Sequence, residues 1–303
     1  MIVLNTTKEL INVENWADIE ARPGFTPNLD PNAHKLLSII GRYLHPERRR
    51  CGLSNCHTPH AKGYIVVTTD GRETNIGKDC GKNYFGVDFE TMTQQFERDV
   101  TEKENRETLF TFSFRTEELR AKLTELRRQV RGADWVYRLT RALVEGSKGC
   151  PSVLVRQLGT MVKTRNPILL ISREATSQEV ENMESTQGRR LPRPQYIDEA
   201  VAQIDGIEAL YPEADVRKLL VFDIEEPLKK FEGENIDSMT FERLRHWARW
   251  VNTVIEPTVE AAARAVDHGR RLLVAENLQP LERLLGRGED IDQFAKYLKT
   301  LRT

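Results

Sequence analysis

The sequence predicts a mainly α-helical protein, with a multi-helix body and a small cysteine-containing module near its N-terminus. From residue 88 onward, apolar residues recur at spacings of three and four in one segment after another, as in amphipathic helices. Three of the four cysteines and two of the six histidines fall between residues 51 and 86. The length of 303 residues allows two or three domains or one elongated helical body.

The first 45 residues predict a helical lead-in. Thr7 to Trp16 is expected to form a short helix, and the Pro- and Gly-containing residues 22–31 a loop. Asn32 to Leu44 is expected to be helical, because its apolar side chains fall on one side, and His45-Pro46 is expected to end that helix. The apolar residues in question are Leu36, Ile39, Ile40 and Tyr43.

Residues 46–90 are expected to form a zinc module. Cys51 and Cys56 are separated by four residues and suit a tight metal-binding turn, and Cys80 suits a distant ligand. Structural zinc takes four nitrogen or sulfur ligands in a tetrahedron, so a fourth is needed. His60 is the first choice for it and His57 the alternative, because His57 directly follows a cysteine that already holds the metal.

A β-hairpin is predicted between the second and third cysteines. Tyr64 to Thr69 is β-branched and aromatic, Asp70-Gly71 is a strong turn signal, and Glu73 to Ile76 is the return strand. A short helix should then start near Cys80. This order of turn, hairpin and helix, with the stretch NIGKDCGKNYFG, resembles a treble-clef zinc finger, except that the helix supplies one ligand and not two. The resemblance covers about a tenth of the chain, and it implies one structural Zn²⁺ per chain but no activity.

Residues 91–185 predict a basic helical region. An amphipathic helix is expected from Asp88 toward Glu107, and others are expected over 116–131 and 134–146. The alternating Phe110, Phe112 and Phe114 favour a brief strand or an extended linker. The polar segment 185–194, with one Gly and two Pro, predicts a domain boundary.

Residues 195–303 predict an acidic helical domain. Tyr196 to Leu210 and Pro212 to Phe231 are expected to be helices, the second kinked at Pro227, and Thr240 is expected to begin a longer helical segment. Residues 176–303 hold eighteen Lys and Arg against twenty-four Asp and Glu. Residues 46–86 hold seven against four, and residues 87–175 sixteen against thirteen.

This basic front suggests non-enzymatic binding to a DNA or RNA backbone through the zinc module and adjacent basic helices. Basic side chains next to the cysteines and along one helical sector are the candidate phosphate contacts, although nearby glutamates make a salt-bridged helix face an alternative for the second group. The candidates are Arg48, Arg49, Arg50, Lys62, Lys78, Lys82, Arg120, Arg127 and Arg131.

A protein-interaction or inhibitor module acting through the C-terminal half is the second hypothesis, with Trp247 and Trp250 as its candidate contacts. A zinc enzyme is the third, because no nucleophile, base and orienting group can be assembled and the common catalytic motifs are absent. The sequence has no run of eighteen apolar residues and no secretory signal, so we expect no membrane partner and a cytoplasmic location.

Overall fold

The computed structural model describes residues 1–6, 9–146, 149–286 and 288–302. The chain forms two compact units. The first unit is Met1–Phe112 with Asn235–Ala248, and the second is Ser113–Glu234 with Arg249–Thr303. The segment 185–194 lies inside the second unit, where it comprises the end of a helix that runs to Gln187 and most of the connection to the next strand. The chain therefore mixes α and β structure and is not simply mainly α.

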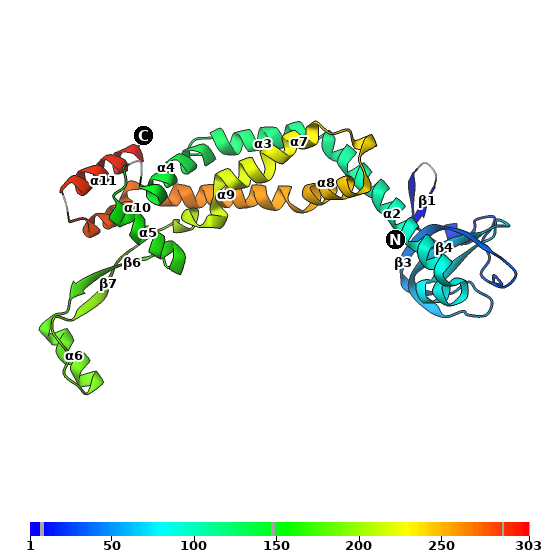
Figure 1. The fold of residues 1–303 in the computed structure, drawn as a ribbon, viewed down its shortest axis with the longest axis horizontal. Helices are drawn as coiled ribbons and strands as arrows, with labels where there is room; N and C mark the ends of the chain where they lie inside the picture. The colour runs from blue at the N-terminus through cyan, green and yellow to red at the C-terminus, as the bar shows by residue number, and fades with distance from the viewer. Residues whose placement is uncertain (7–8, 147–148, 287, 303) are drawn as a thin grey trace. The chain divides into compact units, whose positions relative to one another are not determined.

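The first unit is built on a five-stranded antiparallel sheet in the order β2-β1-β3-β4-β5. A short helix, α1, follows β2, and a long helix, α2, follows β5. Figure 1 shows α2 beside the strands β3 and β4. The elements are β1 (Ile2–Asn5), β2 (Leu10–Val13), α1 (Trp16–Glu20), β3 (Leu36–Arg50), β4 (Pro59–Thr68), β5 (Glu73–Gly77) and α2 (Lys78–Ser113), together with η4 (Ile236–Ser238) and the start of α8 (Phe241–Thr253).

The hairpin and the helix start predicted from the sequence are confirmed. β4 and β5 pair in antiparallel register, and Gly71 in the turn has a φ of 80°, which glycine adopts readily. α2 begins at Lys78. Its helical geometry is interrupted at Gly86 (φ 59°, ψ −140°), so a short first segment carries Cys80 and a second segment runs on to Ser113.

The helix predicted over 32–44 is wrong, because most of this stretch belongs to β3. Ile39, Gly41 and Tyr43 are buried in the two-residue alternation of a strand. A register shift between Leu36 and Ser38 moves Leu36 out of that alternation and gives it a helix-like spacing of three from Ile39. Because of this bulge, the buried residues Leu36 and Ile39 are three apart in the sequence, and this spacing suggested a helix.

The helix predicted over Thr7 to Trp16 is also wrong for residues 10–13. Residues 10–13 form β2, which pairs with β1, and residues 7 and 8 lie outside the described residues. The expected strand or linker at Phe110 to Phe114 is helical up to Ser113, as the end of α2. In both places, tertiary structure overrides a weak local pattern.

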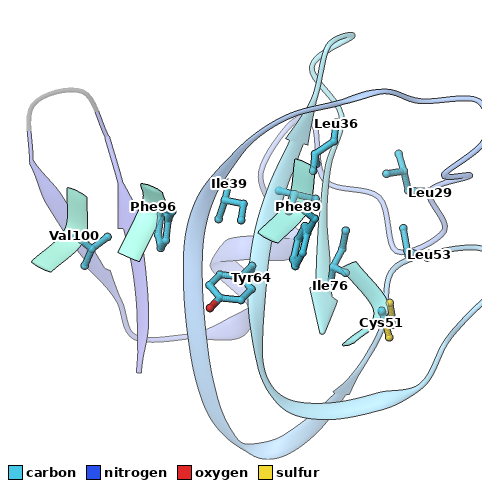
Figure 2. Packing of buried hydrophobic residues seen from close by; sticks show 12 residues of the cluster. Leu29, Leu36, Ile39, Cys51, Leu53, Tyr64, Ile76, Phe89, Phe96 and Val100 are labelled. Carbon is cyan, nitrogen blue, oxygen red and sulfur yellow. The ribbon is translucent and has the colours of Figure 1, made fainter. Parts of the chain in front are cut away.

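The core of the first unit has two clusters of buried side chains. The larger one brings the sheet against α2, where the rings of Tyr64 and Phe89 meet edge to face with centroids 6.0 Å apart (Figure 2). Cys51 and Cys80 belong to this cluster. The second cluster lies around Trp16, Tyr43 and Ile65. The cysteines therefore sit on a substantial apolar core, a feature that the sequence reading did not assign to this module.

The second unit is largely helical. Its elements are α3 (Thr116–Arg128), α4 (Ala133–Glu145), α5 (Ser152–Thr164), β6 (Ile168–Glu174), α6 (Ser177–Gln187), β7 (Tyr196–Gln203), η1 (Ile207–Leu210), η2 (Pro212–Ala214), the π-helix η3 (Lys218–Glu225), α7 (Glu226–Glu232), the end of α8, α9 (Ile255–Leu272), α10 (Ala275–Leu278), η5 (Gln279–Leu284) and α11 (Gly288–Thr300).

The helix predicted over 196–210 is wrong, because its first eight residues form β7 and pair with β6. Figure 1 shows α6 at the far end of this β6–β7 hairpin. Tyr196, Ile197 and Val201 are aromatic or β-branched and suit a strand once a partner is present. The apolar spacing alone did not distinguish the two structures.

Candidate metal centre and its basic surroundings

Three cysteines from separate elements converge in the first unit. Cys51 directly follows β3, Cys56 lies in the loop between β3 and β4, and Cys80 lies in the first turn of α2. Their sulfur atoms all lie within 4.8 Å of one another, and those of Cys56 and Cys80 are 3.2 Å apart. Sulfurs at about 2.3 Å from a tetrahedral zinc ion would be about 3.8 Å apart. The cluster could therefore hold a metal ion.

The cysteine loop, residues 51–58, is fixed by backbone hydrogen bonds to the rest of the unit. The amide of Gly52 donates to Asn75 O at 2.8 Å, and Gly52 O accepts from the amide of Leu29 at 2.7 Å. A Cβ at Gly52 would lie 2.0 Å from Thr74 Oγ1, so only glycine fits there without rearrangement. The sheet thus determines where the first two sulfurs lie.

Of the three thiols, only Cys56 has surroundings that favour the thiolate form, which is the form that binds metals. Burial raises the pKa of Cys51, although the amides of Leu53 and Gly77 act against this. Burial also acts to raise the pKa of Cys56, but hydrogen bonds from the Thr58 hydroxyl and amide outweigh it and lower that pKa. Burial and the neighbouring sulfurs raise the pKa of Cys80 to about 12. A bound cation would stabilise three thiolates that otherwise repel one another.

Neither candidate histidine contributes a nitrogen to the sulfur cluster as it stands. His57 has a positive φ of 54°, and its Nδ1 lies 3.3 Å from Cys51 O. The Nδ1 of His60 lies 2.7 Å from the Tyr43 hydroxyl. The Nε2 of His60 is buried and has no hydrogen-bond partner among the described atoms.

His60 is packed tightly against the end of β5. A Cβ at Gly77 would lie 2.7 Å from the His60 ring. The Asn75 amide donates to Arg50 O at 2.8 Å and to the Tyr43 oxygen at 3.3 Å. Tyr43 and Asn75, which lie 17 and 15 residues from His60 in the sequence, thus orient this candidate ligand. The sequence reading missed both, because nothing in the local pattern marks such long-range partners.

Four basic side chains near the cysteine loop are exposed and form no ion pair or side-chain hydrogen bond among the described residues. They are Arg48, Arg50, Lys62 and Lys78, hereafter the free basic set. Arg48 and Arg50 are two apart on β3 and so point to the same face. Arg49 points to the other face, where its guanidinium lies 5.4 Å from the centre of the Trp16 ring and 3.1 Å from His45 Nε2.

Other candidate phosphate contacts are already bound within the protein. Lys82 forms an ion pair with Glu90 at 2.9 Å. In the second unit, Arg120 is held by Glu232, and Arg127 by Glu225 and Asp134. Arg131 lies over the Trp135 ring at 5.4 Å. The alternative of a salt-bridged face therefore describes Arg120 and Arg127. One of the nearby glutamates that suggested it, Glu117, pairs with Arg120 at 4.0 Å, and the closer partners come from elsewhere in the chain.

The two tryptophans considered as contacts for a protein partner are buried. Trp247 is 5% exposed and Trp250 is 7% exposed, and the indole of Trp250 donates to Asp223 O at 3.1 Å. Neither side chain offers a surface to a partner.

We find no protein-family model, curated protein or solved structure that matches this chain. Among the described residues, no helix has the length and apolar character needed to cross a membrane.

Proposed function

We propose that the first unit is a zinc-stabilised module that binds the phosphate backbone of nucleic acid. Three thiolates form a donor set typical of structural zinc. The proposed role of the metal is local, because the unit already has an apolar core. Zinc would join the cysteine loop to the first turn of α2 and so fix the surface around them.

His60 is the preferred fourth ligand. Its Nε2 is a buried nitrogen without a hydrogen-bond partner among the described atoms, and a metal would satisfy it. Its Nδ1 contact with Tyr43 is the kind of outer contact that orients a metal-binding histidine. His60→Ala should therefore weaken metal binding, and His57→Ala should retain it. The reverse ranking would assign the fourth position to His57.

The free basic set carries the nucleic-acid proposal. Several arginines elsewhere in the first unit are bound to carboxylates, as in the Arg22–Glu73 and Arg42–Glu97 pairs at 2.6 Å. Beside the cysteine loop, the side chains of the free basic set are exposed and form no ion pair among the described residues, and phosphates are the ligands that such a surface suits. These contacts would position a strand without reading its sequence.

The test is binding to single- and double-stranded DNA and RNA by fluorescence anisotropy at low salt, using the full chain. Arg48→Glu with Arg50→Glu should abolish binding and leave metal content unchanged. Arg49 is left in place because it packs on Trp16. Lys296→Glu with Lys299→Glu, on α11 of the second unit, makes the same charge change and should bind like the wild type. No binding by wild-type protein would refute the proposal.

A further inference from the structure

A cavity of about 360 Å³ lies beside the cysteine cluster, between the first residues of β4 and the first turn of α2. The β4–β5 ladder ends at the Gly63–Gly77 pair, and the chain then turns into α2 at Lys78. This change of direction leaves the space beside β4 open. Its volume lies at the lower end of the range for small-ligand sites, about 300–1,000 Å³.

The floor of the cavity is closely packed. A Cβ at Gly63 would lie 2.6 Å from the Tyr43 hydroxyl, and one at Gly77 would lie 2.7 Å from the His60 ring. The hydrogen bonds from Tyr43 and Asn75 hold this floor together. The pocket is therefore preformed, and a ligand would not have to order its floor.

Two lysines from different elements line the cavity. Lys62 comes from β4 and Lys78 from α2, and both are exposed members of the free basic set. Asp79 is the one carboxylate among the described lining residues, so two lysines face one carboxylate in the lining.

We propose that this pocket binds a phosphate group, with the ammonium groups of Lys62 and Lys78 contacting its oxygens. This inference rests on the proposed nucleic-acid function, and it assigns one phosphate of the bound strand to this pocket. Lysine binds phosphate as a point charge and does not require the planar geometry of arginine. The phosphate could be internal or at the end of a strand, since both present the same oxygens.

Single substitutions in the full chain test the pocket by anisotropy with a labelled oligonucleotide. Lys62→Ala and Lys78→Ala should each weaken binding by about tenfold, as expected for loss of a charged hydrogen bond. Lys82→Ala is the matched control, because Lys82 lies one helical turn beyond Lys78 and is paired with Glu90. It should change the affinity less than twofold. Asp79→Asn should tighten binding by removing the opposing charge.

A second comparison uses the same oligonucleotide with and without a 5′-phosphate. If wild-type protein binds the phosphorylated strand more tightly, and Lys62→Ala and Lys78→Ala lose this preference, the pocket binds a terminal phosphate. If wild-type protein binds the two strands equally, and both lysine variants still bind more weakly than wild type, the pocket binds an internal phosphate.

Affinities of Lys62→Ala and Lys78→Ala that match the wild type would overturn the inference. If the Arg48→Glu, Arg50→Glu variant still lost binding, the proposed function would stand without the pocket. No binding of any strand by wild-type protein would instead overturn the proposed function. Metal content measured on every variant identifies any that has lost the cysteine site.

Discussion

Replacing Arg48 and Arg50 with alanine removes two of the four members of the free basic set. If each of the four neutralises one phosphate of duplex DNA, the logarithm of affinity should fall with the logarithm of salt concentration with a slope of about −3.6. Between about 50 and 200 mM salt, wild-type protein should then lose about 150-fold in affinity. The variant should show a slope of about −1.8 and lose only about 12-fold.

The assay is a series of anisotropy titrations over that salt range with two unrelated duplex sequences. Both duplexes should give the same slopes, because phosphate contacts carry no sequence information. Arg120→Ala with Arg127→Ala is the control, since carboxylates already bind both arginines. An unchanged slope in the Arg48→Ala, Arg50→Ala variant, or an equal fall in the control, would refute the reasoning.

Three further outcomes follow from the structure. Cys80→Ser should lose the metal and expose the amides of residues 51–58 to hydrogen exchange, while the sheet remains folded on its apolar core. Gly77→Ala should destabilise the first unit by about 1–3 kcal/mol in urea unfolding, because its Cβ would meet the His60 ring. Arg127→Ala should cost about 1 kcal/mol or less in the second unit, since its pairs are partly exposed.

Local signals predicted the part of the first unit that carries the cysteines. Asp70-Gly71 marked the turn of the β4–β5 hairpin, and the spacing of Cys51 and Cys56 marked the loop before it. These features depend on short-range turn chemistry. The start of α2 near Cys80 was predictable for the same reason.

The strands and ion pairs that were not predicted from the sequence depend on contacts between distant residues. The sequence of β3 predicted a helix because a bulge displaces Leu36 from the strand alternation. The sequence of β7 predicted a helix because the local pattern does not show that β6 is its partner. Arg127 pairs with Asp134, in the next helix, and with Glu225, 98 residues away. No spacing rule on α3 could have shown that this arginine is already paired.

The metal content of the purified full chain tests the central proposal most directly. Elemental analysis should find one zinc per chain in wild-type protein and none in Cys80→Ser. A thiol reagent should react with Cys51, Cys56 and Cys80 only after a chelator is added. Protein that contains no zinc, with all three thiols reacting freely in the native state, would contradict the proposal.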